Sequence, residues 1–307
     1  MRHLYCRTVE PNHNCQAPTL YQPGCCSNGW CEITEKIDLR PYLLSPVLDQ
    51  GLLNSCSGCA LSAAVEITLN REQDHFFECG NGSKASAMFI YYYERLLSNK
   101  ELENTPVYLD DGFTVLTSFG VCCAELWPYP ETSVPQSLWQ LAKDGTLEEI
   151  TQEMSRILQE KESLIKSLLE QKPSEEAKVQ AKEFNNIKYT QLSIENGMNE
   201  IKHALSNKTP IVFGFIEPQS FFDIAANGEM PMPAEDELRI GGHAVCAVGF
   251  DDEKQAILIR NSYGKDFGID GYCYMPYEFI LGQYTDAEGN KHPNAFNFYC
   301  ILEEGNN

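Results

Sequence analysis

One cysteine in this chain stands where a thiol could act as a nucleophile. Cys56 closes the run DQGLLNSC, which starts at Asp49, and a stretch of helix-forming residues, 60–69, follows it. The start of a helix presents unpaired N–H groups and the positive end of the helix dipole, and both stabilise a thiolate. Free cysteine is also among the most buried residue types, so this stretch alone fits a core position equally well.

A nucleophilic thiol needs a base, and His243 stands in the context best suited to that role. Two glycines, ending in Gly242, precede it and the apolar run 244–250 (AVCAVGF) follows it. This pattern predicts a rigid place at the edge of a buried sheet, where Gly242 allows close approach. Asn261 follows a second apolar run, 256–259, so we expect it at the end of a neighbouring strand, where its amide could orient the imidazole.

The order and spacing of these residues resemble those of the papain-like cysteine peptidases. Gln50 precedes Cys56 by six positions, His243 opens a strand pattern, and Asn261 begins the motif NSYG. The resemblance covers about 32–134 and 185–300 and is closest to the bacterial-type branch of the family. Further segments match the family in the same order: 38–40, 46–50, 110–112, 119–122, 126–129 and 268–272.

The resemblance implies a two-lobed α+β fold and an endopeptidase that works through an acyl-enzyme. In chain order, the implied roles are oxyanion donor, nucleophile, general base and then acid, and the group that orients this base: Gln50, Cys56, His243 and Asn261. The expected substrate-cleft residues are Gly112, Gly242 and Tyr263. No cofactor and no metal ion is expected, and the expected partner is a protein or peptide substrate.

The chain departs from the family's pattern on both sides of the expected site. Ser57 stands where an aromatic residue commonly follows the nucleophile, and Tyr263 and Phe267 replace two tryptophans near the asparagine. These changes put the shielding of the hydrogen bond between Asn261 and His243 in doubt. A catalytically weak or inactive pseudo-peptidase is therefore one alternative function, and an exopeptidase or amidase with the same triad is another.

The elements that must position these residues change along the chain. The first half is rich in helix formers and predicts helices at 60–69 and 86–97, whereas short apolar runs beyond residue 185, such as 211–216, predict strands. Segregated helices and strands are typical of an α+β protein. The expected lobes are a mainly helical one at 32–134, with Gln50 and Cys56, and a mainly β one at 185–307, with His243 and Asn261.

A third kind of sequence, 135–184, separates the two lobes. Thr146 and Glu149 form a capping box, and apolar residues then recur mostly at spacings of three and four, which predicts an amphipathic helix. Pro173 interrupts the pattern and Ser174 can cap a second helix. We interpret this segment as an inserted helical hairpin whose apolar stripe packs on the main body. A protein partner bound at that stripe is the alternative.

The chain has 307 residues and 13 cysteines, which crowd its first 31 positions. We interpret 1–31 as a disulfide-stapled appendage, with a zinc knuckle that includes His3 and His13, or a flexible leader, as alternatives. If Cys56 stays unpaired, an even number of cysteines remains to form disulfides. That parity favours secretion or another oxidising compartment, with the cytoplasm as the alternative.

Charge and hydropathy exclude two classes of partner. The formal net charge of −21 argues against a large phosphate-binding surface, so nucleic acid is not expected. No apolar run reaches the roughly 20 residues that a membrane-spanning helix needs.

Overall fold

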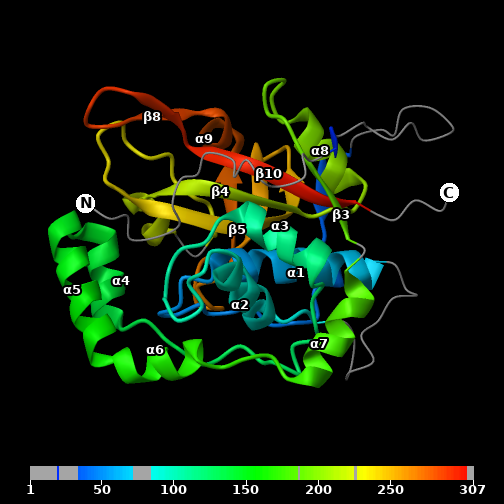
Figure 1. Ribbon diagram of the computed structural model, residues 1–307. Helices are drawn as coiled ribbons and strands as arrows, with labels where there is room; N and C mark the ends of the chain where they lie inside the picture. The colour runs from blue at the N-terminus through cyan, green and yellow to red at the C-terminus, as the bar shows by residue number, and fades with distance from the viewer. Residues whose placement is uncertain (1–18, 21–33, 72–83, 186, 225–226, 303–307) are drawn as a thin grey trace, which may run out of the picture.

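The computed structural model describes residues 19–20, 34–71, 84–185, 187–224 and 227–302. A layer of helices covers one face of a twisted sheet (Figure 1). The cysteines and histidines of 1–31 lie outside these ranges, and so do the expectations of a disulfide-stapled appendage, a zinc knuckle or a leader. Within the described ranges, no helix is both long enough and apolar enough to cross a membrane.

The central helix carries the expected nucleophile. Both predicted helices are confirmed, since 60–69 lies inside the first helix and Ser86 caps the second, its side chain accepting a hydrogen bond from the N–H of Phe89 at 3.1 Å. The first helix is buried from Cys56 to Ile67, because it lies between the sheet and the other two helices (Figure 1). The three helices are α1 (Cys56–Arg71), α2 (Ala87–Leu97) and α3 (Leu109–Ser118).

The sheet supplies the expected base. Its strands follow the order β1-β3-β10-β4-β5-β6-β7, β2 pairs with β5, and all these pairs are antiparallel except β1 with β3. The predicted strands at 211–216, 244–250 and 256–259 are confirmed as parts of β4, β5 and β6. The strands are β1 (Thr19–Leu20), β2 (Lys36–Asp38), β3 (Lys188–Gln191), β4 (Ile211–Pro218), β5 (Arg239–Asp251), β6 (Ala256–Arg260), β7 (Tyr272–Pro276) and β10 (Ala295–Leu302).

Smaller elements complete the β part. A two-stranded hairpin lies apart from the main sheet, and short helices connect the strands. They are β8 (Gln283–Thr285), β9 (Lys291–Pro293), α8 (Asn199–Ser206), α9 (Tyr277–Leu281), and the 3₁₀ helices η1 (Arg40–Tyr42), η2 (Lys182–Phe184) and η3 (Gln219–Asp223).

The segment between the lobes forms four helices rather than the expected two-helix hairpin. The capping box of Thr146 and Glu149 is confirmed, but the helix that it starts ends at Lys161, whose φ of −101° and ψ of 7° are not helical. In Figure 1 the four run along one side of the helical layer, from α4 and α5 at one end to α7 at the other. They are α4 (Gln136–Asp144), α5 (Leu147–Glu160), α6 (Glu162–Leu169) and α7 (Glu175–Ala181).

The apolar stripe of these helices is used inside the molecule. Ile150, Ile157 and Ile165 are buried in one cluster with Phe89 and Trp127 of the helical lobe. Burial of this kind removes apolar area from water, which stabilises the folded chain. The packing expected for the stripe is therefore found, and a partner at the stripe is not supported.

The cysteines correct the parity argument. Six described cysteines are free and buried, and Cys123 is disulfide-bonded. The expectation that Cys56 alone stays unpaired is wrong, because several thiols serve as small apolar side chains in the core. The free cysteines are Cys56, Cys59, Cys122, Cys246, Cys273 and Cys300.

Candidate active site

Cys56 is the first residue of α1, and its side chain faces the sheet rather than solvent. The residue is 1% exposed. The N–H groups of the first helical turn have no partner within the helix, so their dipoles favour a negative charge at this position. The thiol also hydrogen-bonds His243, which comes from β5. Helix and sheet thus meet at these two side chains.

Asn261 fixes the ring of His243. Imidazole Nε2 lies 2.8 Å from the amide Oδ1 of Asn261, which also accepts the N–H of Ser262 at 2.8 Å. Because Oδ1 accepts both bonds, Nε2 carries the hydrogen, and Nδ1 is left to face the thiol. The register explains the meeting, since β5 and β6 are antiparallel neighbours and Asn261 follows the last residue of β6.

The surroundings of His243 favour its protonated form. Burial by itself lowers the pKa of this imidazole, but the nearby carboxylate of Glu217 and the hydrogen bond with Cys56 outweigh burial and raise the pKa to about 9. At neutral pH the ring is then an imidazolium beside the thiol. Such a pair stabilises a thiolate, which is the nucleophilic form of cysteine.

Tyr263 covers the imidazole. Its ring stacks on that of His243 with centroids 4.8 Å apart and planes 21° apart. Phe222 stacks on the other side of Tyr263 at 5.9 Å, and Trp139 of α4 meets Tyr263 edge-on at 5.2 Å. Phe267 adds a further edge contact at 5.7 Å. The shielding that the lost tryptophans put in doubt is therefore supplied by other aromatic rings.

Gln50 is tied to the residue that follows Asn261. Its Oε1 accepts the hydroxyl of Ser262 at 2.6 Å, its Nε2 donates to the carbonyl of Leu53 at 3.1 Å, and its backbone N–H donates to the carbonyl of Ser262 at 2.8 Å. The next residue, Gly51, has a φ of +55°, and a Cβ there would lie 1.1 Å from the carbonyl oxygen of Thr132. Only glycine fits this turn, which explains the sequence DQG.

The structure places the two predicted cleft glycines differently. Gly242 lies in β5 directly before His243, paired with Ile216 of β4. Gly112 is not near the catalytic residues. It lies inside α3, where an added Cβ would meet Leu61 Cδ1 at 2.2 Å and Glu94 Oε1 at 2.5 Å. The sequence suggested a cleft loop, but Gly112 is a close-packing position between three helices.

Two buried carboxyl groups near the site were missed from the sequence. Glu94 accepts the hydroxyl of Ser57 at 2.9 Å, and burial raises the pKa of Glu94 well above its usual range. A hydroxyl after the nucleophile thus serves this buried acid, which accounts for the absence of an aromatic residue there. Glu217 accepts the phenol of Tyr263 at 2.5 Å. Its signal was an acidic residue directly after the apolar run 211–216.

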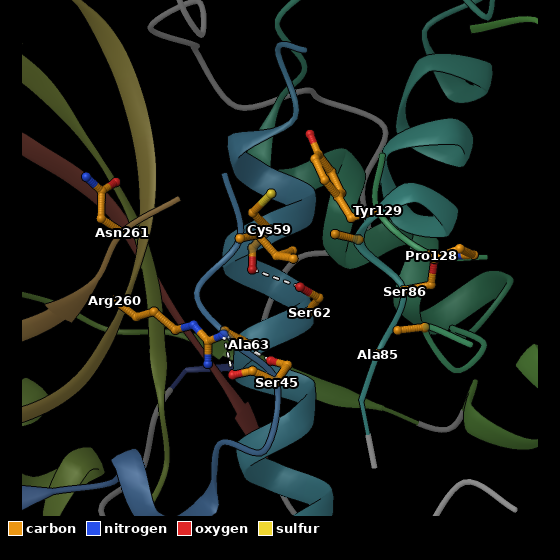
Figure 2. A pocket seen from close by; sticks show the side chains of 13 residues that line it. Ser45, Cys59, Ser62, Ala63, Ala85, Ser86, Pro128, Tyr129, Arg260 and Asn261 are labelled. Carbon is orange, nitrogen blue, oxygen red and sulfur yellow. Dashed lines mark hydrogen bonds between the residues drawn. The ribbon is translucent and has the colours of Figure 1, made fainter. Parts of the chain in front are cut away.

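A cavity of about 150 Å³ adjoins α1 one turn beyond Cys56. Figure 2 shows α1, with Cys59, between the segment that carries Arg260 and the segment that carries Ser86. The guanidinium of Arg260 donates to the Ser45 hydroxyl at 2.9 Å and to the Pro46 carbonyl at 2.6 Å. These bonds join the chain before Gln50 to β6. Neither Cys56 nor His243 lines the cavity.

Comparisons with known proteins agree with this geometry. The model of the papain family of cysteine proteases matches residues 107–282. An uncharacterized peptidase C1-like protein, L477, of Acanthamoeba polyphaga mimivirus is 30% identical over 256 residues, which are 81% of this chain and 69% of that protein. Xylellain, a cysteine protease from Xylella fastidiosa, has a similar structure, with a TM-score of 0.69, 25% identity and coverage of 97% of this chain and 95% of that one. Digestive procathepsin L 3 of the Tenebrio molitor larval midgut gives a TM-score of 0.59 at 15% identity, over 94% of this chain and 75% of that one.

Proposed function

Because this chain belongs to the papain family of cysteine proteases and is a cysteine peptidase, we propose that it cleaves internal peptide bonds of proteins through the thiolate of Cys56. One observation carries the proposal. His243 lies between the Cys56 thiol, which it hydrogen-bonds, and Asn261 Oδ1, 2.8 Å from its Nε2. Nucleophile, base and orienting amide in this order are the minimum that acyl transfer by a thiol requires.

Each proposed step uses a group in that arrangement. The Cys56 thiolate attacks the scissile carbonyl carbon, and the oxygen takes the negative charge. The backbone N–H of Cys56 and the second N–H of the Gln50 side chain stabilise this oxyanion. The imidazolium of His243 then gives its proton to the leaving amine, and the C–N bond breaks. Water attacks the thioester, giving one proton to His243, and the carboxylic acid product leaves as the thiolate is restored.

Loss of the thiol tests this mechanism directly. We expect Cys56→Ala to abolish hydrolysis of a denatured protein substrate while Cys59→Ser, one helical turn later, keeps it. Both variants should retain the far-UV circular dichroism of the parent. Hydrolysis by Cys56→Ala at the parent's rate would show that another group does the chemistry.

Cleavage near chain ends is a second candidate function, and α4 favours it. The leaving amine must lie beside the imidazole that protonates it, and Trp139 of α4 packs on the Tyr263 ring that covers this imidazole. The helix is fixed there, because Gln219 of η3 donates to the carbonyl of Gly145 at 2.7 Å. A fixed helix at this end of the site leaves less room for residues beyond the scissile bond.

Peptides that differ only after the scissile bond separate these two functions. An endopeptidase cleaves a peptide with six residues beyond that bond at least as fast as one with two, because longer substrates gain contacts. A chain-end peptidase prefers one or two residues there. An amidase cleaves amino-acid amides and leaves proteins intact.

The partner-binding pseudo-peptidase has lost the features that suggested it. Ser57 hydrogen-bonds Glu94, and Tyr263 covers the imidazole in place of a tryptophan. The inserted helices bury their stripe against the body of the protein. These placements support an active peptidase.

An oxidising compartment is the proposed location of the protein. Cys123 is disulfide-bonded, and the segment 1–31 is dense in cysteine. Disulfides persist mainly in oxidising compartments. Titration of free thiols in the unfolded, unreduced protein tests this location. All 13 cysteines free would place the protein in the cytoplasm.

A further inference from the structure

We propose that Glu217 is a positioning residue of the catalytic pair, whose carboxylate is held by the phenol of Tyr263 and stabilises the imidazolium of His243. This role rests on the proposed function, because it concerns the same thiol and imidazole. Neither the order of motifs nor the spacing of residues pointed to it. Three observations carry it.

The first observation is the register of two neighbouring strands. His243 of β5 pairs with Phe215 of β4, and Glu217 lies two residues further along β4. Paired residues share a face of a sheet, and so do residues two apart on one strand. Glu217 is therefore the diagonal neighbour of His243 on the same face. The rings of Phe215 and His243, with centroids 5.7 Å apart, confirm which face this is.

The second observation is how the carboxyl group is held. Glu217 is 0% exposed, and its Oε1 accepts the phenol of Tyr263 at 2.5 Å. The other oxygen, Oε2, has no hydrogen-bond partner among the described residues. Tyr263 itself stacks on the imidazole. One side chain thus covers the base with its ring and holds the acid with its hydroxyl.

The third observation is the charge around the pair. The groups that act on His243 are Cys56 of α1, Glu217 of β4 and Asn261 after β6, and those that act on Glu217 are His243, Tyr263 and Cys56. Within these two sets His243 is the only cation. Burial raises the pKa of Glu217, whereas the charge of His243 and the hydrogen bond from Tyr263 lower it. Each charge therefore favours the other, and the carboxylate is present when the imidazole is protonated.

The position of Glu217 gives it a role distinct from that of Asn261. The amide of Asn261 orients the ring but carries no net charge, so it does little to decide whether the ring is protonated. A buried carboxylate acts through space on that equilibrium, and low dielectric makes the effect larger than it would be in water. Without it, the pair shifts from thiolate and imidazolium toward neutral thiol and imidazole.

The pH dependence of Glu217→Gln tests this role in the full chain. Removal of the carboxylate lowers the pKa of the imidazolium, so the alkaline limb of kcat/KM on a fluorogenic peptide should move to lower pH by about one unit or more. KM should change little, because Glu217 is not proposed to touch substrate. Tyr263→Phe keeps the stacked ring and removes the hydroxyl, so it should move the limb in the same direction by less. Glu253→Gln, an exposed acid in the turn after β5, removes the same charge and should leave the limb in place.

A second measurement separates this role from the proposed function. The rate at which uncharged iodoacetamide alkylates Cys56 reports the thiolate against pH without any peptide substrate. In Glu217→Gln the alkaline limit of the thiolate–imidazolium plateau should move down by the same amount. An unmoved limit in a folded Glu217→Gln, or in Tyr263→Phe if Glu217→Gln does not fold, overturns the role of Glu217. A parent protein that shows the plateau but hydrolyses no peptide overturns the proposed function and leaves the role of Glu217 intact.

Discussion

The ring of Tyr263 lies over the imidazole of His243, with centroids 4.8 Å apart and an interplanar angle of 21°. Phe221 and Phe222 extend this aromatic layer. The layer keeps water from the hydrogen bond between His243 and Asn261, both of which are buried. A hydrogen bond in a dry site is stronger and better oriented than one in water. The tyrosine therefore meets a structural need that the family more often meets with tryptophan.

Selective labelling of Cys56 is the first expected outcome. Among the other described free thiols, burial raises the pKa of Cys122, Cys246 and Cys300 to about 12 and that of Cys59 higher still. An epoxide inhibitor of the papain class should therefore modify the folded protein at Cys56 at neutral pH, ahead of these four. Peptide mapping by mass spectrometry locates the label. A label on Cys59 at the same rate would contradict the assignment.

Asn261→Ala should lower kcat/KM at least about tenfold, because the imidazole loses the acceptor that orients it. Asn261→Asp keeps an oxygen in reach of Nε2 and of the Ser262 N–H, so it should retain more activity than Asn261→Ala. Steady-state kinetics on one fluorogenic peptide compares the two. Equal losses in both variants would show that the amide does more than accept a hydrogen bond.

Gln50→Ala should lower kcat about 10²- to 10³-fold with little change in KM, as expected for the loss of one oxyanion donor. Gln50→Glu is the matched variant, since it can still accept the hydroxyl of Ser262 but has no side-chain N–H. It should lose as much activity as Gln50→Ala. A Gln50→Glu enzyme with the parent's kcat would mean that the amide of Gln50 does not bind the oxyanion.

Gly112→Ala should destabilise the protein by about 1–3 kcal/mol, because the new Cβ overlaps Leu61 and Glu94 in a closely packed region. Ser118→Ala, at the exposed end of the same helix, is the control and should change the free energy of unfolding little. Urea unfolding measures both. A normal stability with a raised KM would instead return Gly112 to the substrate cleft.

Glu94→Gln should change how stability depends on pH. Because burial raises the pKa of Glu94 well above 4.5, the folded state holds a proton that the unfolded state releases, so stability falls as pH rises from the unfolded pKa toward the folded one. A glutamine has no proton to lose and can still accept the Ser57 hydroxyl. The Tm of Glu94→Gln should thus equal that of the parent near pH 4 and exceed it at pH 8. Parallel Tm curves across this range would contradict a buried neutral Glu94.

The catalytic residues could be found from the sequence because each has a strong local context. Cys56 starts a helix, His243 lies in an apolar run, and Asn261 follows another such run. Strand patterns predicted that the last two are neighbours. The strand register then brings them together, and the bond between Nε2 and Oδ1 follows.

The residues around the site could not be found in this way, because their roles depend on contacts between distant segments. Glu217, Glu94 and Trp139 acquire their meaning only when β4, α2 and α4 pack against other elements. Gly112 shows the reverse error. An acidic pair followed by glycine indicated a loop, but helix packing requires the glycine and the acids occupy the first turn of α3. The four inserted helices were also obscured, since Lys161 does not announce a break in its helix.

The hydrogen bond from the hydroxyl of Ser262 to Gln50 joins residues 212 positions apart. During synthesis, a growing chain carries Cys56 long before the ribosome adds His243, Asn261 and Tyr263. The thiol therefore has neither its base nor its aromatic cover while most of the polypeptide is made. Peptidase activity must await the completion of β5 and β6, so the nascent chain and the ribosome are spared from it during translation.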